Sequence, residues 1–300
     1  MMLIIDKLTL KDSFSDGEKA LSEFILDKGR EIDRYSIRSL AEGAYTSPAT
    51  MIRLCKKLGF SGFDEFKKEF IRELDYLDRC PGAVDFNFPF EKHDTPMKAA
   101  NSIATLYEET IRDTMSLLQL GELRRAAALL RCRPKICVYS AGTAINQAES
   151  FREKMLKIGR SVTISNNLNY QLYEACCLSS EDIAIIISYS GETPQIIQIA
   201  QECRRRAVPV IALTSFGENT LTQYAACKLT LSTKESIFQN VGDYSSHLSV
   251  NLLLDILYSI YFLENYEENY QTKLDKARRL EKHRTSSNPV LMDTAAKSDK

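Results

Sequence analysis

The sequence has no tryptophan, only three histidines and few residues that break regular structure, with 12 Gly and 8 Pro among 300 residues. Collagen-like and mucin-like chains are rich in Gly or Pro, and disordered chains are poor in apolar residues. With 44% apolar and 26% charged residues, the composition is typical of a globular protein. The length favours two domains, because single hydrophobic cores rarely grow beyond about 250–300 residues.

Cysteine is not scarce, but its eight residues lack the spacing of a disulfide or metal scaffold. No CxxC pair occurs, and Cys55 and Cys137 lie in apolar runs, where a free thiol packs as a small hydrophobe. Three histidines offer little to complete a zinc site. We therefore expect reduced cysteines, no metal site and no cofactor.

Long hydrophobic runs and a dominant charge sign are also missing. The longest apolar run, residues 248–263, contains Asp255 and is shorter than the ~18 residues that cross a bilayer. The N-terminus carries no basic leader. Lys and Arg number 39 against 40 Asp and Glu, so any anion-binding surface must be local. We expect a cytoplasmic protein with no membrane contact.

The pattern along the chain changes twice. Residues 1–78 are charged and helical in periodicity, and residues 79–97 contain three prolines, which predicts a linker. After Pro134, runs of β-branched residues alternate with amphipathic stretches, as in βαβ units. The sequence predicts an α/β protein: an all-α domain, then a doubly wound, mainly parallel five-stranded α/β/α domain over 98–270, then the end of a helix and a disordered tail over 271–300.

The expected strands are short, and two of them are apolar throughout, as strands covered on both faces must be. We place strands at 135–140, 161–165, 182–188, 208–214 and 228–231, and helices at 145–158, 168–178, 193–206, 219–226 and 243–266.

Two short helical segments, 36–44 and 47–58, lie close together in the first domain. Tyr45 and Thr46 join them, Ser47 is a good N-cap, and Pro48 suits the first helical position, where no donor is lost. One face of the second segment is apolar. The opposite face carries no acid and consists of Ala49, Thr50, Arg53, Lys56 and Lys57.

This arrangement predicts a helix-turn-helix whose second helix reads the major groove of DNA. Residues 34–57 hold five basic residues and one acid, which concentrates positive charge where phosphates would bind. The alternative is an ordinary helical hairpin with lysines in water. The Ser-Pro cap, the sharp turn and the acid-free face favour DNA binding.

Hydroxyl-rich turns follow two of the expected strands, at residues 140–144 (SAGTA) and 188–193 (SYSGET). Ligands of open α/β sheets bind at the carboxyl ends of strands, and helix N-termini favour phosphate. The hydroxyls could instead merely cap helices. Two such turns favour a site for a phosphorylated small molecule. The candidate residues are Ser140, Gly142, Thr143, Ser188, Ser190, Gly191 and Thr193.

Two further polar residues follow the last strand. Glu235 could contact sugar hydroxyls or transfer a proton, although a lone surface Glu more often has no role. His247 is more simply read as structural, and Tyr189 as a packing residue.

The segment 40–70, with its KKLGF block, closely resembles the N-terminal domain of RpiR-type transcriptional regulators. The segment 135–235 resembles the SIS (sugar isomerase) domain that those regulators carry, through residues 154–159 (KMLKIG), 182–193 (DIAIIISYSGET) and 232–236 (STKES). Departures from the family pattern include SAGTA in the first turn, His247 in place of Arg, and Tyr45 where many such turns have Gly.

The resemblance implies a helix-turn-helix regulator that binds a double-stranded DNA operator, with a SIS domain that binds a phosphosugar effector. It implies a homo-oligomer, dimer or tetramer, formed through the SIS domains, and a role in sugar or amino-sugar catabolism. On this basis Ser47, Thr50 and Arg53 would face DNA, with Lys56 and Lys57 on phosphates. Ser188, Ser190 and Thr193 would hold the phosphate, with the 140–143 turn beside them and Glu235 near the sugar.

Two other functions fit parts of the sequence. A phosphosugar isomerase with a helical extension would need an acid–base pair, and Glu235 has no evident partner except His247. A SIS module that acts only through protein partners would not bind DNA at all.

Overall fold

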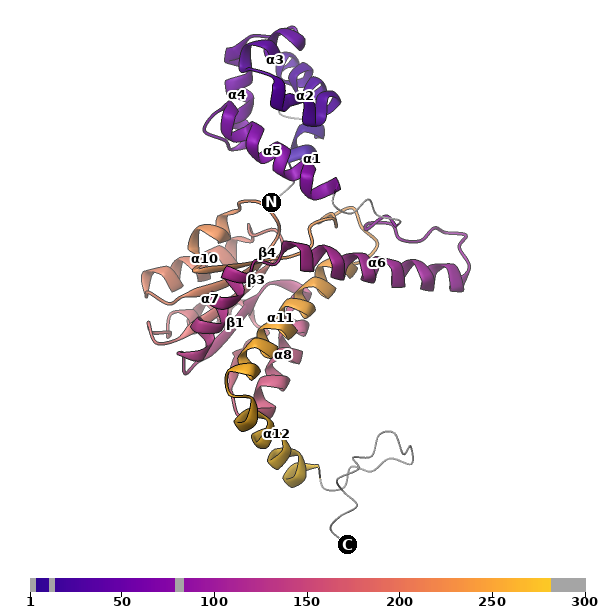
Figure 1. The fold of residues 1–300 in the computed structure, drawn as a ribbon. Helices are drawn as coiled ribbons and strands as arrows, with labels where there is room; N and C mark the ends of the chain where they lie inside the picture. Colours follow the sequence, from indigo (N-terminus) through magenta and orange to yellow (C-terminus); the bar gives the residue numbers. More distant parts are fainter. Residues whose placement is uncertain (1–3, 11–13, 79–83, 282–300) are drawn as a thin grey trace.

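The computed structural model describes residues 4–10, 14–78 and 84–281 and consists of a helical part followed by an α/β part (Figure 1). The helical part is packed around one apolar core to which every one of its helices contributes. Its elements are α1 (Ile4–Thr9), α2 (Asp16–Lys28), the 3₁₀ helix η1 (Gly29–Arg34), α3 (Ile37–Gly43), α4 (Pro48–Leu58) and α5 (Phe63–Asp78).

The α/β part begins with two helices and then alternates strands with helices. Its elements are α6 (Pro96–Leu117), α7 (Leu120–Arg131), β1 (Ile136–Ser140), η2 (Gly142–Ala144), α8 (Ile145–Lys157), β2 (Val162–Ile164), α9 (Leu168–Ala175), β3 (Ile183–Ser188), α10 (Pro194–Arg205), β4 (Val210–Thr214), η3 (Thr220–Tyr224), β5 (Cys227–Thr230), α11 (Tyr244–Glu264) and α12 (Tyr266–Leu280).

The five strands form one parallel sheet in the order β2-β1-β3-β4-β5. The chain therefore reverses direction across the sheet between β1 and β3, and this is the place where doubly wound sheets bind ligands. In the register of this pair Ser140 lies opposite Ile187. The predicted five-stranded, doubly wound fold is confirmed.

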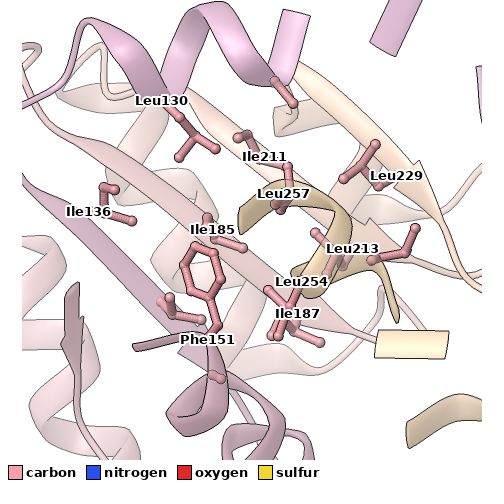
Figure 2. Packing of buried hydrophobic residues seen from close by; sticks show 14 of the residues in the cluster. Leu130, Ile136, Phe151, Ile185, Ile187, Ile211, Leu213, Leu229, Leu254 and Leu257 are labelled. Atoms are coloured by element: carbon pink, nitrogen blue, oxygen red, sulfur yellow. The ribbon is translucent and has the colours of Figure 1, made fainter. Parts of the chain in front are cut away.

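Helices cover both faces of the sheet, so its central strands are buried on both sides. Figure 2 shows the core on one face, where Ile136, Ile185 and Ile211 point toward α7, α8 and α11. The opposite face carries the alternate residues, such as Tyr139 and Ile186, against α9 and α10. This alternation is the period-2 geometry of a strand.

Three sequence-based expectations are wrong in detail. Residues 220–224 form a 3₁₀ helix instead of an α-helix, and α6 begins at Pro96, inside the segment predicted as linker. The C-terminal helix end is a separate helix, because Asn265, at φ −138° and ψ 60°, ends α11 before α12 begins. The predicted tail beyond residue 281 lies outside the described residues.

Helix α6 buries polar residues and exposes apolar ones. Its Thr110 Oγ1 donates to Ser245 Oγ at 3.1 Å, and Thr114 Oγ1 lies 2.9 Å from Ser249 Oγ, so small hydroxyl side chains join α6 to α11. Tyr107 and Met115 of α6 are exposed. Helix α11 is the one helix among the described residues that is long and apolar enough to cross a membrane. Its buried residues pack on the sheet, in the same core as α7 and α8.

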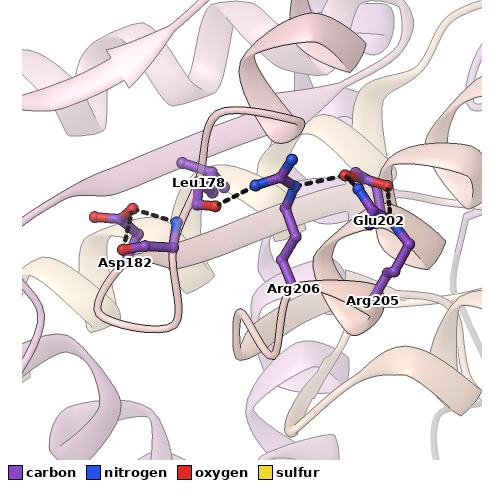
Figure 3. Close-up of polar contacts among 6 residues, drawn as sticks. Leu178, Asp182, Glu202, Arg205 and Arg206 are labelled. Atoms are coloured by element: carbon purple, nitrogen blue, oxygen red, sulfur yellow. Dashed lines mark hydrogen bonds and ion pairs between the residues drawn. The ribbon is translucent and has the colours of Figure 1, made fainter.

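An ionic cluster lies at the amino ends of the strands, where the end of α10 meets the loop before β3 (Figure 3). Glu202 accepts hydrogen bonds from Arg205 at 2.6 Å and from Arg206 at 2.5 Å, and these lower the pKa of its carboxyl to about 2. Arg206 also donates to the carbonyl of Leu178 at 3.2 Å, which ties α10 to the loop before β3. Asp182 accepts from the Ser179 amide in the same loop.

This cluster predicts a pH dependence of stability. Because the folded pKa of Glu202 lies below its unfolded value, its contribution is present above about pH 4.5 and is lost as the pH falls toward 2. We expect Glu202→Gln to flatten the acid limb of stability, measured by urea unfolding between about pH 3 and pH 6. Glu181→Gln, at an exposed carboxylate in the loop before β3, is the matched control. Parallel acid limbs for wild type and Glu202→Gln would contradict the assignment.

Candidate functional site

The predicted helix-turn-helix is formed by α3 and α4. Thr46 N donates to Ala41 O at 2.8 Å across the turn, and Tyr45 adopts φ 54°, a left-handed conformation that Gly takes more easily. Ser47 Oγ accepts from Thr50 N at 3.2 Å, and Pro48 stands at the first helical position. The caps read from the sequence therefore start the second helix where the prediction placed it.

Five of the six predicted DNA-contact residues are exposed, on α4 or at its N-cap: Ser47, Ala49, Arg53, Lys56 and Lys57. Thr50 is instead buried, with 8% of its surface exposed, because α2 packs beside the first turns of α4. Its Oγ1 accepts from Arg53 Nη2 at 3.2 Å, so Thr50 holds the arginine and does not itself face outward.

The polar face of α4 contains no acidic residue of its own, but an acid of α2 reaches it at Lys57. Its Nζ lies 2.6 Å from Glu18 Oε2 on α2, and Glu18 is buried. Burial raises the pKa of Glu18, but hydrogen bonds from Lys57 and Ser15 outweigh this effect and leave the pKa below its usual value. The charge of Lys57 is thus partly neutralised although its side chain is exposed, and Arg53 and Lys56 carry the rest of the exposed positive charge of α4.

The second site is a cavity of about 270 Å³ at the carboxyl ends of β1 and β3. Because these two strands are neighbours, the turns that follow them lie side by side, as the sequence analysis expected. The cavity is lined by seven of the eight predicted ligand residues, namely Ser140, Gly142, Thr143, Ser188, Ser190, Thr193 and Glu235. Gly191 is not part of the lining.

Gly191 shapes the turn at the end of β3. It adopts φ 66°, and a Cβ there would lie 2.2 Å from the Asn219 side chain. The Gly191 amide donates to Ser188 O at 3.1 Å, and this hydrogen bond closes the turn. Ser188 Oγ lies 3.4 Å from Thr193 Oγ1 at the start of α10. Thr193 makes no capping hydrogen bond to that helix, which leaves its hydroxyl available to the cavity.

The turn after β1 is fixed by residues that the sequence analysis did not single out. Gln171 of α9 is buried and bonds the backbone of Ser140 on both sides, accepting from its amide at 3.1 Å and donating to its carbonyl at 3.0 Å. Thr143 Oγ1 lies 2.8 Å from His247 Nε2 of α11. Ser140 thereby contributes buried backbone to the cavity. Thr143 contributes an exposed hydroxyl beside the imidazole of His247.

Glu235 is a buried residue, so the reading of it as a lone surface carboxylate is wrong. Its two carboxylate oxygens accept from the amides of Ser245 at 3.1 Å and Ser246 at 3.0 Å, at the start of α11. Burial raises the pKa of Glu235, and these amides oppose the rise. Glu235 therefore caps α11 and lines the cavity at once.

The lining of the cavity offers hydrogen-bond donors without side-chain cations. No Lys or Arg occurs among the described residues that line it, and its titratable lining groups are Glu235, Asp243, His247 and Tyr189. The donors are the hydroxyls and the N-terminal end of α10, because the first amides of α11 already donate to Glu235. Ser246 and His247 were not among the predicted site residues. Their place at the start of a helix after the last strand is the sequence signal that could have found them.

The geometry does not form the acid–base pair that an isomerase would need. Glu235 is bonded to two backbone amides and His247 to Thr143, so the two side chains have different partners. Tyr189, read as a packing residue, donates its hydroxyl to the carbonyl of Glu235 at 2.7 Å.

Comparisons with known proteins agree with this architecture. The family description "Helix-turn-helix domain, rpiR family" matches residues 2–76, and "SIS domain" matches residues 129–259. An uncharacterized HTH-type transcriptional regulator of Caldanaerobacter subterraneus is 28% identical over 86% of this chain and 90% of its own length. Another, from Haemophilus influenzae, is 26% identical over 90% of this chain and 93% of its own length.

Solved structures share the fold. The NanR protein of Vibrio vulnificus, solved in complex with ManNAc-6P, superimposes with a TM-score of 0.61 at 20% identity and covers 94% of this chain and 99% of its own. The sugar isomerase domain of an RpiR transcription factor from Sphaerobacter thermophilus gives 0.52 at 16% identity over 60% of this chain and 98% of its own. The chain belongs to the RpiR-type transcriptional regulators, with a helix-turn-helix domain followed by a SIS domain, and it is not an enzyme.

Proposed function

We propose that this regulator binds a double-stranded DNA operator through the exposed face of α4 and is controlled by a phosphorylated sugar in the cavity at β1 and β3. The observation that carries the proposal is the meeting of two hydroxyl-rich turns and the N-terminus of α10 in one cavity. A phosphate needs several convergent donors, and this cavity provides them without a cation.

The class of sugar is an amino-sugar phosphate. The NanR protein, which shares this fold, was solved with ManNAc-6P, and an acetamido sugar phosphate supplies both an anion and hydrogen-bonding groups. Control of amino-sugar catabolism is the corresponding role. The protein acts in the cytoplasm as a homo-oligomer, dimer or tetramer, because paired recognition helices read the two halves of an operator.

The first test concerns Arg53, which Thr50 holds on the exposed face of α4. We expect Arg53→Ala to weaken binding to a duplex selected from random sequences by about tenfold or more, because an arginine contact to bases or phosphates is lost. Arg124→Ala, which removes an exposed cation from α7, is the matched control and leaves affinity unchanged. Fluorescence anisotropy with labelled duplex measures both. Equal affinity of Arg53→Ala and wild type, with the fold intact by circular dichroism, rejects the role.

The second test separates two adjacent lysines. Lys57→Ala leaves the Glu18 carboxylate buried without its ion pair, and we expect the free energy of unfolding to fall by about 1–2 kcal/mol. Lys56→Ala should change it by less than about 0.5 kcal/mol and should instead weaken duplex binding. Urea unfolding and anisotropy give the two values. Equal stabilities of the two variants would argue against the Glu18 pairing.

The third test concerns the turn after β3. Millimolar ManNAc-6P should raise the melting temperature of the wild type by several degrees, about the shift expected when ligand exceeds its Kd a hundredfold. Ser188→Ala combined with Ser190→Ala should abolish this shift while operator affinity is retained. Ser259→Ala, on the exposed side of α11, is the control. A double variant that still responds would place the ligand elsewhere.

A further inference from the structure

The end of α5 is anchored in the α/β part by one buried tyrosine, Tyr76, with 1% of its surface exposed. Its hydroxyl donates to Asp113 Oδ2 of α6 at 2.9 Å and accepts from the amide of Thr233 at 2.7 Å. Its ring stacks on Phe216 with centroids 4.6 Å apart. Figure 1 shows α5 as the helix that reaches from the helical part toward the sheet.

The segment 232–236 makes contact with Tyr76 at one residue and with the ligand cavity two residues later. Thr233 donates its amide to Tyr76 and accepts from Phe216 N at 2.8 Å. Glu235 lines the cavity, caps α11 and accepts at its carbonyl from the hydroxyl of Tyr189. Tyr189 belongs to the turn that follows β3. One short backbone segment thus links that turn to the last turns of α5.

These links are buried, so each is costly to break alone. Asp113 is fully buried, and its second oxygen, Oδ1, has no hydrogen-bond partner in the described part of the chain, so the carboxylate depends on the Tyr76 hydroxyl. Thr233 and Glu235 are also buried. A buried donor or acceptor that loses its partner costs the fold the full desolvation free energy of that group, because water cannot replace the partner. A shift of the segment at the cavity must therefore be matched at Tyr76.

A longer-range charge interaction also joins the helical part to the turn after β3. Burial lowers the pKa of Lys7 on α1, while the charges of Glu73 and Glu192 oppose this effect. Glu192 lies in the turn after β3, between Ser190 and Thr193 of the cavity. The charge of that turn therefore acts on the helical part at longer range, beside the hydrogen-bonded link through Tyr76.

We propose that Tyr76 couples the ligand cavity to the DNA-binding helices through the segment 232–236. This inference rests on the proposed function, because it describes how occupancy of the cavity changes the position of α5. Coupling of this kind is reciprocal. A change at Tyr76 must alter the cavity, and a change at Tyr189 must alter the end of α5.

Hydrogen–deuterium exchange of the full-length protein, with neither DNA nor sugar, tests both directions. Tyr76→Phe keeps the stacked ring and removes the two hydrogen bonds. We expect the amides of Ser245 and Ser246, which donate to Glu235, to exchange on the order of fivefold faster, the factor that one net hydrogen bond contributes. Tyr189→Phe removes the hydroxyl bond to Glu235, and amides 72–76 of α5 should exchange faster.

The control is Tyr224→Phe, which removes the hydroxyl that accepts from Gln201 on the outside of the α/β part. It should change neither region. Faster exchange of Thr233 alone in Tyr76→Phe, with Ser245 and Ser246 unchanged, overturns the coupling. Equal acceleration in every element, including the strand β3, also overturns it, because Tyr76 would then only stabilise the fold. The result does not depend on whether the protein binds an amino-sugar phosphate, so the coupling and the proposed ligand are judged separately.

Discussion

The pairing of β1 with β3 decides where this protein can bind a ligand. Parallel strands end at the same edge of the sheet, and the chain has to leave both strands there, in opposite directions, to reach β2 and β4. The turns after these two strands are thereby side by side, with the N-terminus of α10 behind one of them. The cavity, the capping of α11 by Glu235 and the contact of Thr233 with Tyr76 all lie around this point.

The two proposed binding sites offer different groups to an anion. The face of α4 presents cations to solvent, where a polyanion can be held at long range and released by salt. The cavity presents hydroxyls and the N-terminal end of α10, and its titratable lining groups include two carboxylates. Such a site recognises the geometry of a bound anion more than its charge. It suits a sensor that has to release its ligand when the concentration falls.

Polar groups also join the elements that surround the cavity. Thr110 and Thr114 of α6 bond to Ser245 and Ser249 of α11, and the amide of Ser232 donates to Ser249 Oγ at 3.0 Å. Small hydroxyl side chains let the two helices approach closely and keep their hydrogen bonds satisfied. The start of α11 is thus connected with α6, which also carries Asp113, the partner of Tyr76. The result is a buried polar region between the cavity and the end of α5.

The sequence by itself determined the class of the fold, the two hydroxyl-rich turns and the caps of α4, because strand periodicity, turn residues and capping are local properties. It also placed seven residues of the cavity, through the rule that ligands bind where strands end. Only the tertiary structure decided that Thr50 is buried, that Lys57 pairs with Glu18 and that Glu235 caps a helix. Each of these depends on an element distant in the chain, and neither burial nor pairing across such distances leaves a periodic trace in the sequence.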